Sequence, residues 1–245
     1  MGTSASYHPS LKGKPEWGDL SGTVTSSCNG QALKDEQVKN ILGKYVNVIH
    51  GSSKAGSGKS AVMGKAGLNS ATKIGSFLGG LISGGFDIEK TLNDIGITDL
   101  SGKKLSDIVN NLIEYCSGPA SSIDDIAAKE ATRLLFEELF EKAKSIEELQ
   151  EQLKATLSQE NLEEMIIKYF GYYVFEHLSV MFHEKLTKQK GDRNRGKLFK
   201  RIKDFIIESL KRVNNKTPLK NIDWSGGKAK DLISKILTDV LAVFE

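Results

Sequence analysis

The sequence predicts an all-α protein, a helical bundle with a flexible N-terminal arm. From residue 35 onward, apolar side chains recur every three or four positions, which is the spacing of a helix that buries one face. Sustained alternation of apolar and polar residues is missing, and only 45–50 is compatible with a short buried strand. Clusters of glycine, serine and proline separate the periodic segments where turns are needed.

Residues 1–34 are expected to form the arm. Between residues 10 and 30, glycine, serine, threonine and lysine are mixed with prolines, which leaves too few apolar side chains for a core. Trp17 and Leu20 are the expected anchors of this arm, on the helical body in the favoured interpretation or on a partner protein in the alternative. Residues 35–245 form the predicted helical domain, and the Gly118-Pro119 turn is compatible with a subdivision near 117–122.

Nine segments of this domain carry the helical periodicity. The first starts at Asp35 and stops at Gly51. The second, 61–83, has small residues at strict four-residue intervals (Gly67, Ala71, Gly75 and Gly79), so another helix can approach it closely. Ser122 and Ser145 resemble N-caps, because an acidic residue follows each of them three positions later. The other predicted helices are 88–95, 104–116, 123–143, 146–157, 160–188, 196–213 and 228–244.

Segment 160–188 is apolar nearly all the way round in its middle, as expected of a helix at the centre of a bundle. Its many aromatic residues would also suit a flat cleft that binds bases. A role in the core is the favoured interpretation.

Composition excludes several functional classes. The chain has 245 residues, 39% of them hydrophobic and 27% charged, and its formal net charge of +3 is too small to attract the whole molecule to nucleic acid or membrane. Cys28 and Cys116 lack metal-type spacing and are expected to be free thiols in a reducing cytoplasm. The start lacks a secretory leader, and no apolar stretch approaches the roughly 20 residues of a membrane-spanning helix. A cytoplasmic protein without metal or cofactor is predicted.

Charges are segregated along the chain. Residues 124–164 carry 12 acidic and 5 basic side chains, whereas 185–216 carry 12 basic and 3 acidic ones. The basic segment 185–216 would suit contacts with phosphates, which makes a nucleic-acid-binding adaptor the alternative function. A solvated face, or pairing with the acidic segment, is the favoured interpretation.

The sequence offers little support for catalysis. The loop Gly56-Ser57-Gly58-Lys59-Ser60 resembles a phosphate-binding loop, but Ser53 stands where that motif requires its first glycine. A flexible basic loop is favoured over nucleotide binding. The histidines 8, 50, 177 and 183 lack the spacing of a metal site, and packing roles are expected for them.

The amino end is the strongest candidate for chemistry. Gly2 is small enough for removal of Met1, which would leave a glycine α-amine with a reference pKa of about 7.7–8.0 and a nucleophilic fraction at neutral pH. The terminus is therefore interpreted as a substrate. Gly2 with Ser6 also fits the pattern for N-myristoylation, which by itself gives only marginal membrane attachment. The expected partner-binding residues are Gly2, Thr3, Ser4, Ala5, Ser6, Tyr7 and Trp17.

Several short stretches along the whole chain carry a family resemblance. They are Met1-Gly2-Thr3-Ser4-Ala5-Ser6, 10–15 with Trp17, 24–30, 73–78, 172–179 and 223–227. With these stretches the sequence resembles the QatB family, the small component of the Qat anti-phage defence systems.

The resemblance implies a function and three companions: the ATPase QatA, the QueC-like enzyme QatC and the TatD-like nuclease QatD. QueC enzymes adenylate the carboxylate of a 7-deazaguanine and let ammonia attack it. A QueC-like enzyme that admits a glycine α-amine in place of ammonia would attach a deazaguanine to Gly2. The resemblance thus implies a non-enzymatic component whose terminus is modified by its partner.

Overall fold

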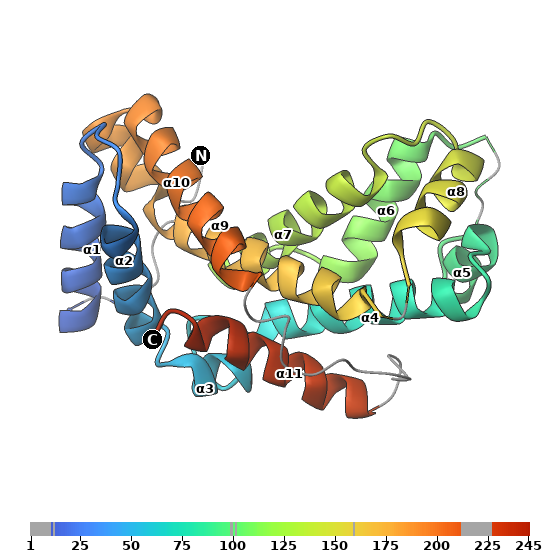
Figure 1. The fold of residues 1–245 in the computed structure, drawn as a ribbon, viewed down its shortest axis with the longest axis horizontal. Coiled ribbons are helices and arrows are strands. Elements are labelled where there is room, and N and C mark those ends of the chain that lie inside the picture. Colours follow the sequence, from blue (N-terminus) through green and yellow to red (C-terminus); the bar gives the residue numbers. More distant parts are fainter. Residues whose placement is uncertain (1–10, 12, 99, 101, 159, 212–226) are drawn as a thin grey trace.

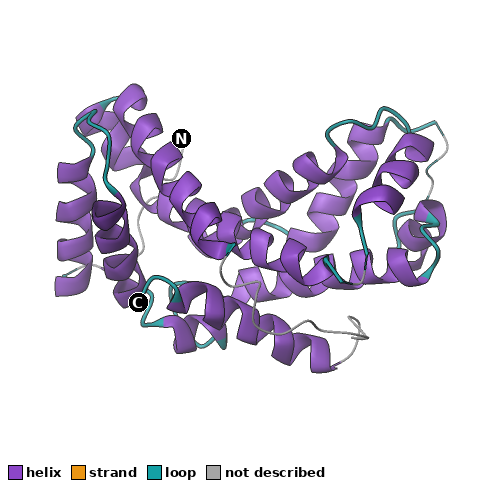
Figure 2. Ribbon diagram, viewed as in Figure 1, coloured by secondary structure: helices purple, strands orange, loops and turns teal. Residues whose placement is uncertain are grey.

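The computed structural model describes residues 11, 13–98, 100, 102–158, 160–211 and 227–245. Within these residues the protein consists of helices, turns and loops, and no strand occurs (Figure 2). The all-α prediction is confirmed. The helices form a V-shaped molecule (Figure 1).

Eleven helices are present in the described part of the chain, and nine of them coincide with the predicted segments to within a few residues. The sequence missed the first and third helices. Residues 45–48 lie inside the second helix, so the strand alternative is wrong. The helices are α1 (Pro15–Ser27), α2 (Asp35–Val48), α3 (Ser52–Gly56), α4 (Lys65–Ser83), α5 (Ile88–Asp94), α6 (Leu105–Ser117), α7 (Ile123–Phe140), α8 (Ile146–Thr156), α9 (Leu162–Lys190), α10 (Asp192–Leu210) and α11 (Gly227–Ala242).

The two limbs of the V are joined by the long helix α9. One limb contains α1, α2, α10 and the C-terminal half of α9, and the other contains α4 to α8, while α3 and α11 lie below the junction (Figure 1). Helix α9 packs against α4, α7, α10 and α11. Its side chains are buried on several sides, among them Tyr169, Phe170, Tyr173 and Phe182. The prediction of a central core helix is confirmed.

Helix α1 corrects the prediction of an arm for residues 15–27. Pro15 stands in its first turn, where the N–H that proline lacks has no helical partner in any case. Leu20 and Val24 lie four positions apart and are fully buried, and α1 packs against α2. Local composition predicted an arm because a short, polar helix is unstable alone and depends on the surface it packs against. Residues 1–10 lie outside the described part.

The small-residue stripe of α4 has the role that its spacing predicted. Gly67, Ala71 and Gly75 are buried, and α4 packs against α6, α7, α9 and α11. A Cβ on Gly67 would fall well inside the van der Waals radius of the Tyr173 ring. The absence of a side chain at Gly67 is therefore what lets α4 approach α9.

The caps at Ser122 and Ser145 are also confirmed. Ser122 accepts a hydrogen bond from the backbone N–H of Asp125, and the Asp125 carboxylate accepts one from the backbone N–H of Ser122. The hydrogen bonds that the Asp125 carboxylate accepts from the hydroxyl and backbone N–H groups of Ser121 and Ser122 lower its pKa, although burial opposes the shift. Ser145 accepts from the backbone N–H of Glu148. Helices α7 and α8 thus begin where the sequence indicated.

Candidate functional site at the base of the N-terminal segment

Leu11 precedes α1 and is buried, with 3% of its surface exposed. Six residues later, Trp17 stacks on Phe182 of α9 with ring centroids 5.2 Å apart and ring planes at 25°. Docking of Trp17 on the body, the favoured interpretation, is confirmed. Gly2, Thr3, Ser4, Ala5, Ser6 and Tyr7 lie outside the described residues, so Trp17 is the one predicted site residue that the structure places.

Polar contacts fix α1 on both of its neighbours. Lys44 of α2 forms an ion pair of 2.7 Å with Asp19 and donates to the Thr23 hydroxyl at 2.8 Å. Lys185 of α9 donates to the hydroxyl of Ser21 at 2.6 Å. The helix that follows the N-terminal segment is therefore attached to the body by its apolar face and by two lysines.

A cavity of about 320 Å³ lies between the start of α1 and the end of α2; we call it the α1–α2 cavity. His50 adopts a left-handed backbone conformation with φ of 70°, which directs the chain into Gly51. Its Nε2 lies 3.5 Å from Lys14 Nζ, and its Nδ1 lies 3.4 Å from the Ser60 hydroxyl. The described residues that line the cavity are Leu11, Lys14, Glu16, Trp17, Asn47, Val48 and His50.

The electrostatics of this cavity favour a neutral imidazole. Burial lowers the pKa of His50, and the charges of Lys14 and Lys54 lower it further, while Glu16 acts in the opposite direction. A neutral imidazole carries one N–H donor and one ring-nitrogen acceptor. Together with the Glu16 carboxylate and the Asn47 amide, the cavity therefore offers donors and acceptors beside an aromatic ring.

Sequence reasoning identified Trp17 and missed Leu11, Asn47 and His50. The available signals were weak: Leu11 is a lone apolar residue in a polar stretch, and His50 precedes a glycine that ends a helix. Neither signal shows that residues 11–17 and 47–50 lie side by side, because their proximity depends on how α1 packs against α2.

The glycine-rich loop 56–60 does not have the geometry of a phosphate-binding loop. Such a loop needs free backbone N–H groups. Here the N–H of Lys59 donates to Lys54 O at 2.9 Å, that of Gly58 to Ala55 O at 3.0 Å, and that of Ser60 to Lys54 O at 3.1 Å. The carbonyl oxygen of Gly56 accepts from the Ser234 hydroxyl of α11 at 2.6 Å. The loop therefore serves to pack α3 against α11.

A buried polar cluster lies behind this loop. His177 is fully buried, with Nδ1 3.0 Å from the Tyr45 hydroxyl and Nε2 3.0 Å from the carbonyl oxygen of Val62. Tyr173 donates to Asp124, and its hydroxyl accepts from the N–H of Gly64 at 2.8 Å. The packing role expected for His177 is confirmed, and the cluster holds the residues before α4 in place.

The described side chains of the basic segment pair mainly with α1, with α2 and with neighbours on α9 and α10. Arg201 pairs with Asp35 and donates to Leu33 O, and Lys203 lies 4.9 Å from the centre of the Tyr172 ring. In the acidic segment, Glu130 and Glu137 pair with Arg133 of the same helix. Among the described residues of the two segments, no ion pair joins one segment to the other. Arg193, Lys197 and Lys200 are exposed and form no ion pair within the described residues.

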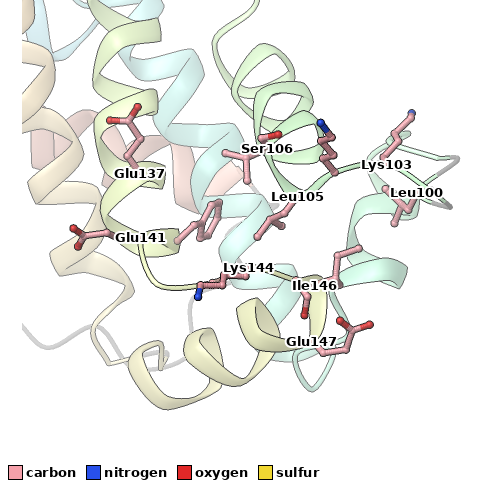
Figure 3. A pocket seen from close by; sticks show the side chains of 15 residues that line it. Leu100, Lys103, Leu105, Ser106, Glu137, Glu141, Lys144, Ile146 and Glu147 are labelled. Atoms are coloured by element: carbon pink, nitrogen blue, oxygen red, sulfur yellow. The ribbon is translucent and has the colours of Figure 1, made fainter.

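A larger open cleft of about 880 Å³ lies at the far end of the other limb, between α6, α7 and α8. Figure 3 shows Leu105 of α6 and Ile146 of α8 beside it, with Glu137 of α7 and Glu141 just after the end of that helix. Three lysines and three glutamates line the cleft, so its lining carries no excess of either charge. It holds none of the predicted site residues.

Within the described residues, no helix combines the length and the apolar character that crossing a membrane requires. Cys28 and Cys116 are both free and buried, and burial raises the pKa of the Cys116 thiol to about 12. Neither thiol is therefore poised for nucleophilic chemistry.

Comparison with known proteins gives one result. No curated protein and no solved structure matches the chain. A family model described as "Qat anti-phage system associated protein QatB" matches residues 55–244, from the end of α3 to α11. This match covers more than three quarters of the chain, which therefore belongs to the QatB family of the Qat anti-phage system.

Proposed function

We propose that this protein is a non-enzymatic component of its anti-phage system and that Gly2, once Met1 is removed, is presented to the QueC-like enzyme QatC for attachment of a deazaguanine. The observation that supports the proposal is the anchor at Leu11 and Trp17. Residues 2–10 precede this anchor, and nine residues of extended chain span up to about 30 Å. That length is sufficient for the α-amine to enter the active site of a docked partner.

The chemistry assigned to this chain is that of a nucleophile. The partner would use ATP to convert the base's carboxylate to an acyl adenylate, with release of pyrophosphate. The lone pair of the Gly2 amine then attacks the acyl carbon, AMP leaves, and the amine loses a proton to form the amide. Glycine suits this step because it has no side chain near the nitrogen, and Thr3, Ser4, Ala5 and Ser6 are small enough to follow it into a narrow channel.

The body would serve as the docking platform. We propose QatC as the direct partner and QatA and QatD as further members of the same assembly. The described part of the structure contains no cluster of three or more metal-binding side chains that would suggest chemistry of its own.

Intact-mass spectrometry tests the proposal. Coexpression with QatC is expected to add the mass of one deazaguanine acyl group, and the gain should map to the N-terminal peptide. Gly2→Pro should abolish the gain, because its secondary amine lies in a ring that hinders attack. Thr3→Ala is the matched control and should retain it. Retention of Met1 in the mature chain, or a gain that maps elsewhere, would contradict the proposal.

A second function is favoured by one observation on the basic segment. Arg193, Lys197 and Lys200 are spaced i, i+4 and i+7 on α10, so they share a face, and all three are exposed. This face would suit the phosphates of a nucleic acid. If it binds duplex DNA, each charge reversal that removes one phosphate contact should reduce the slope of log K against log salt by about 0.9. Lys203→Glu is a poor test, because that side chain packs on Tyr172 and Phe175.

A further inference from the structure

We propose that the α1–α2 cavity binds a guanine-type base and that, in the modified protein, the base carried by Gly2 occupies it. The identity of the base rests on the proposed function. The binding site itself rests on the walls of the cavity.

The first wall is aromatic. Trp17 lines the cavity, and its indole ring is held in place by the stack on Phe182 at 5.2 Å. Nucleic-acid bases bind proteins by stacking on rings that are fixed in this way. The cavity volume of about 320 Å³ lies at the lower end of the roughly 300–1,000 Å³ typical of ligand pockets, which suits a bicyclic base.

The polar side chains of the cavity match one edge of guanine. That edge presents an N–H and an amino group side by side, followed by a carbonyl oxygen, and a 7-deazaguanine retains it. Glu16 is exposed and forms no hydrogen bond or ion pair within the described residues, so its two oxygens are available to accept from the paired donors. Lys14 lies in the same wall and can donate to the carbonyl oxygen. Adenine presents an acceptor where guanine presents its N–H, so the carboxylate would discriminate against it.

The remaining wall connects the cavity to the amino end. Leu11 is buried and lines the cavity, so the segment that carries Gly2 enters the body at this place. A base attached to Gly2 is thus tethered by nine residues to the wall of the cavity, which gives it a high effective concentration there. The terminus would thus occupy two positions: inside the partner during the reaction, and on its own body afterwards.

Fluorescence of Trp17 tests the cavity in the unmodified protein. The chain has 2 tryptophans, so Trp224→Phe leaves Trp17 as the fluorophore. The probe is 7-amido-7-deazaguanine, in which a bare amide replaces the link to Gly2. We expect saturable quenching by this probe and binding about tenfold weaker for adenine, because the charged hydrogen bonds are lost. Glu16→Gln should weaken binding of the probe by about the same factor.

Glu36→Gln is the matched control, because Glu36 is an exposed carboxylate in the first turn of α2 and does not line the cavity. It should bind the probe like the parent protein. Equal binding of adenine and the probe, or equal binding by the Glu16→Gln and Glu36→Gln variants, would overturn the base specificity. The absence of quenching would overturn the site.

The source of the base is tested with the modified protein. If the attached base occupies the cavity, Trp17 should already be quenched in protein of the higher mass, and added probe should cause little further change. Full quenching by the probe in that protein would overturn occupancy by the attached base. Quenching without any mass gain on coexpression would contradict the proposed function and leave a site for a free base. A mass gain without quenching would contradict only this inference.

Discussion

Asp124 and Ala66 are joined by a hydrogen bond of 2.9 Å from the backbone N–H of Ala66 to the Asp124 carboxylate. Asp124 belongs to the first turn of α7 and Ala66 to the first turn of α4. The same carboxylate accepts from the N–H of Gly64 at 3.3 Å and from the Tyr173 hydroxyl. The N-terminus of α4 is therefore capped by a residue of another helix, and this cap connects α4, α7 and α9 at the junction of the two limbs.

Asp124→Ala should lower the free energy of unfolding by about 2–4 kcal/mol, because it removes a cap and leaves the Tyr173 hydroxyl and the Ala66 N–H without an acceptor. Asp87→Ala is the matched control. Asp87 is an exposed N-cap that accepts from Lys90 N at 2.9 Å, and its loss should cost about 1 kcal/mol. Urea unfolding of both variants makes the comparison. Equal losses of unfolding free energy in the two variants would show that Asp124 only caps α4 and does not help to hold α4, α7 and α9 together.

Gly67→Ala should lower the free energy of unfolding by about 1–3 kcal/mol, because its Cβ would collide with the fully buried ring of Tyr173. Gly22→Ala is the matched control, since Gly22 also lies inside a helix but a Cβ there meets open space. That variant should gain up to about 1 kcal/mol from helix propensity alone. Urea midpoints that move in the same direction for both variants would contradict the close approach of α4 to α9.

The periodicity of apolar residues was enough to predict nine helices, because each of them has a buried face that is visible in its own sequence. Helix α1 shows where this approach fails. It buries Leu20 and Val24, and these two with Trp17 make three large apolar residues in thirteen, which do not distinguish a docked helix from a polar arm. The missing information is the surface supplied by α2 and α9, which only the folded chain contains.

The candidate site could be predicted only in part for the same reason. Trp17 was recognisable as an isolated large aromatic residue in a polar segment. The opposite side of the cavity comes from Asn47 and Val48 at the end of α2, and from His50, which has a left-handed backbone conformation that no periodicity indicates. The loop 56–60 shows the opposite case, in which the sequence suggests a phosphate site that the structure does not support. Its sequence is close to the motif, but the N–H groups of Gly58, Lys59 and Ser60 donate to carbonyl oxygens of α3.

Trp17→Ala should detach α1 before the rest of the protein unfolds. The substitution removes the stack on Phe182, which contributes about 0.5–1.5 kcal/mol beyond the buried area. Hydrogen exchange should therefore quicken at the amides of α1, whereas the amides of α9 keep their protection. Trp17→Phe retains an aromatic ring and should restore most of the protection in α1. Unchanged exchange in the alanine variant would show that Leu20, Val24 and the two lysine contacts suffice to hold the helix.

Glu176 should make the protein less stable as the pH rises towards neutrality. Burial raises the pKa of its carboxyl to about 7, the carboxylate of Glu130 adds to the shift, and Lys203 and Arg133 oppose it. In the unfolded chain the pKa is about 4.3, so the folded protein binds the extra proton between these values, and its stability falls from about pH 4.5 to pH 7. Glu176→Gln should remove about 2 kcal/mol of this decline, measured as the difference between urea unfolding at pH 5 and pH 7.5. Glu36→Gln, at an exposed position, should keep the decline of the parent protein, and the same decline in both variants would place the titration elsewhere.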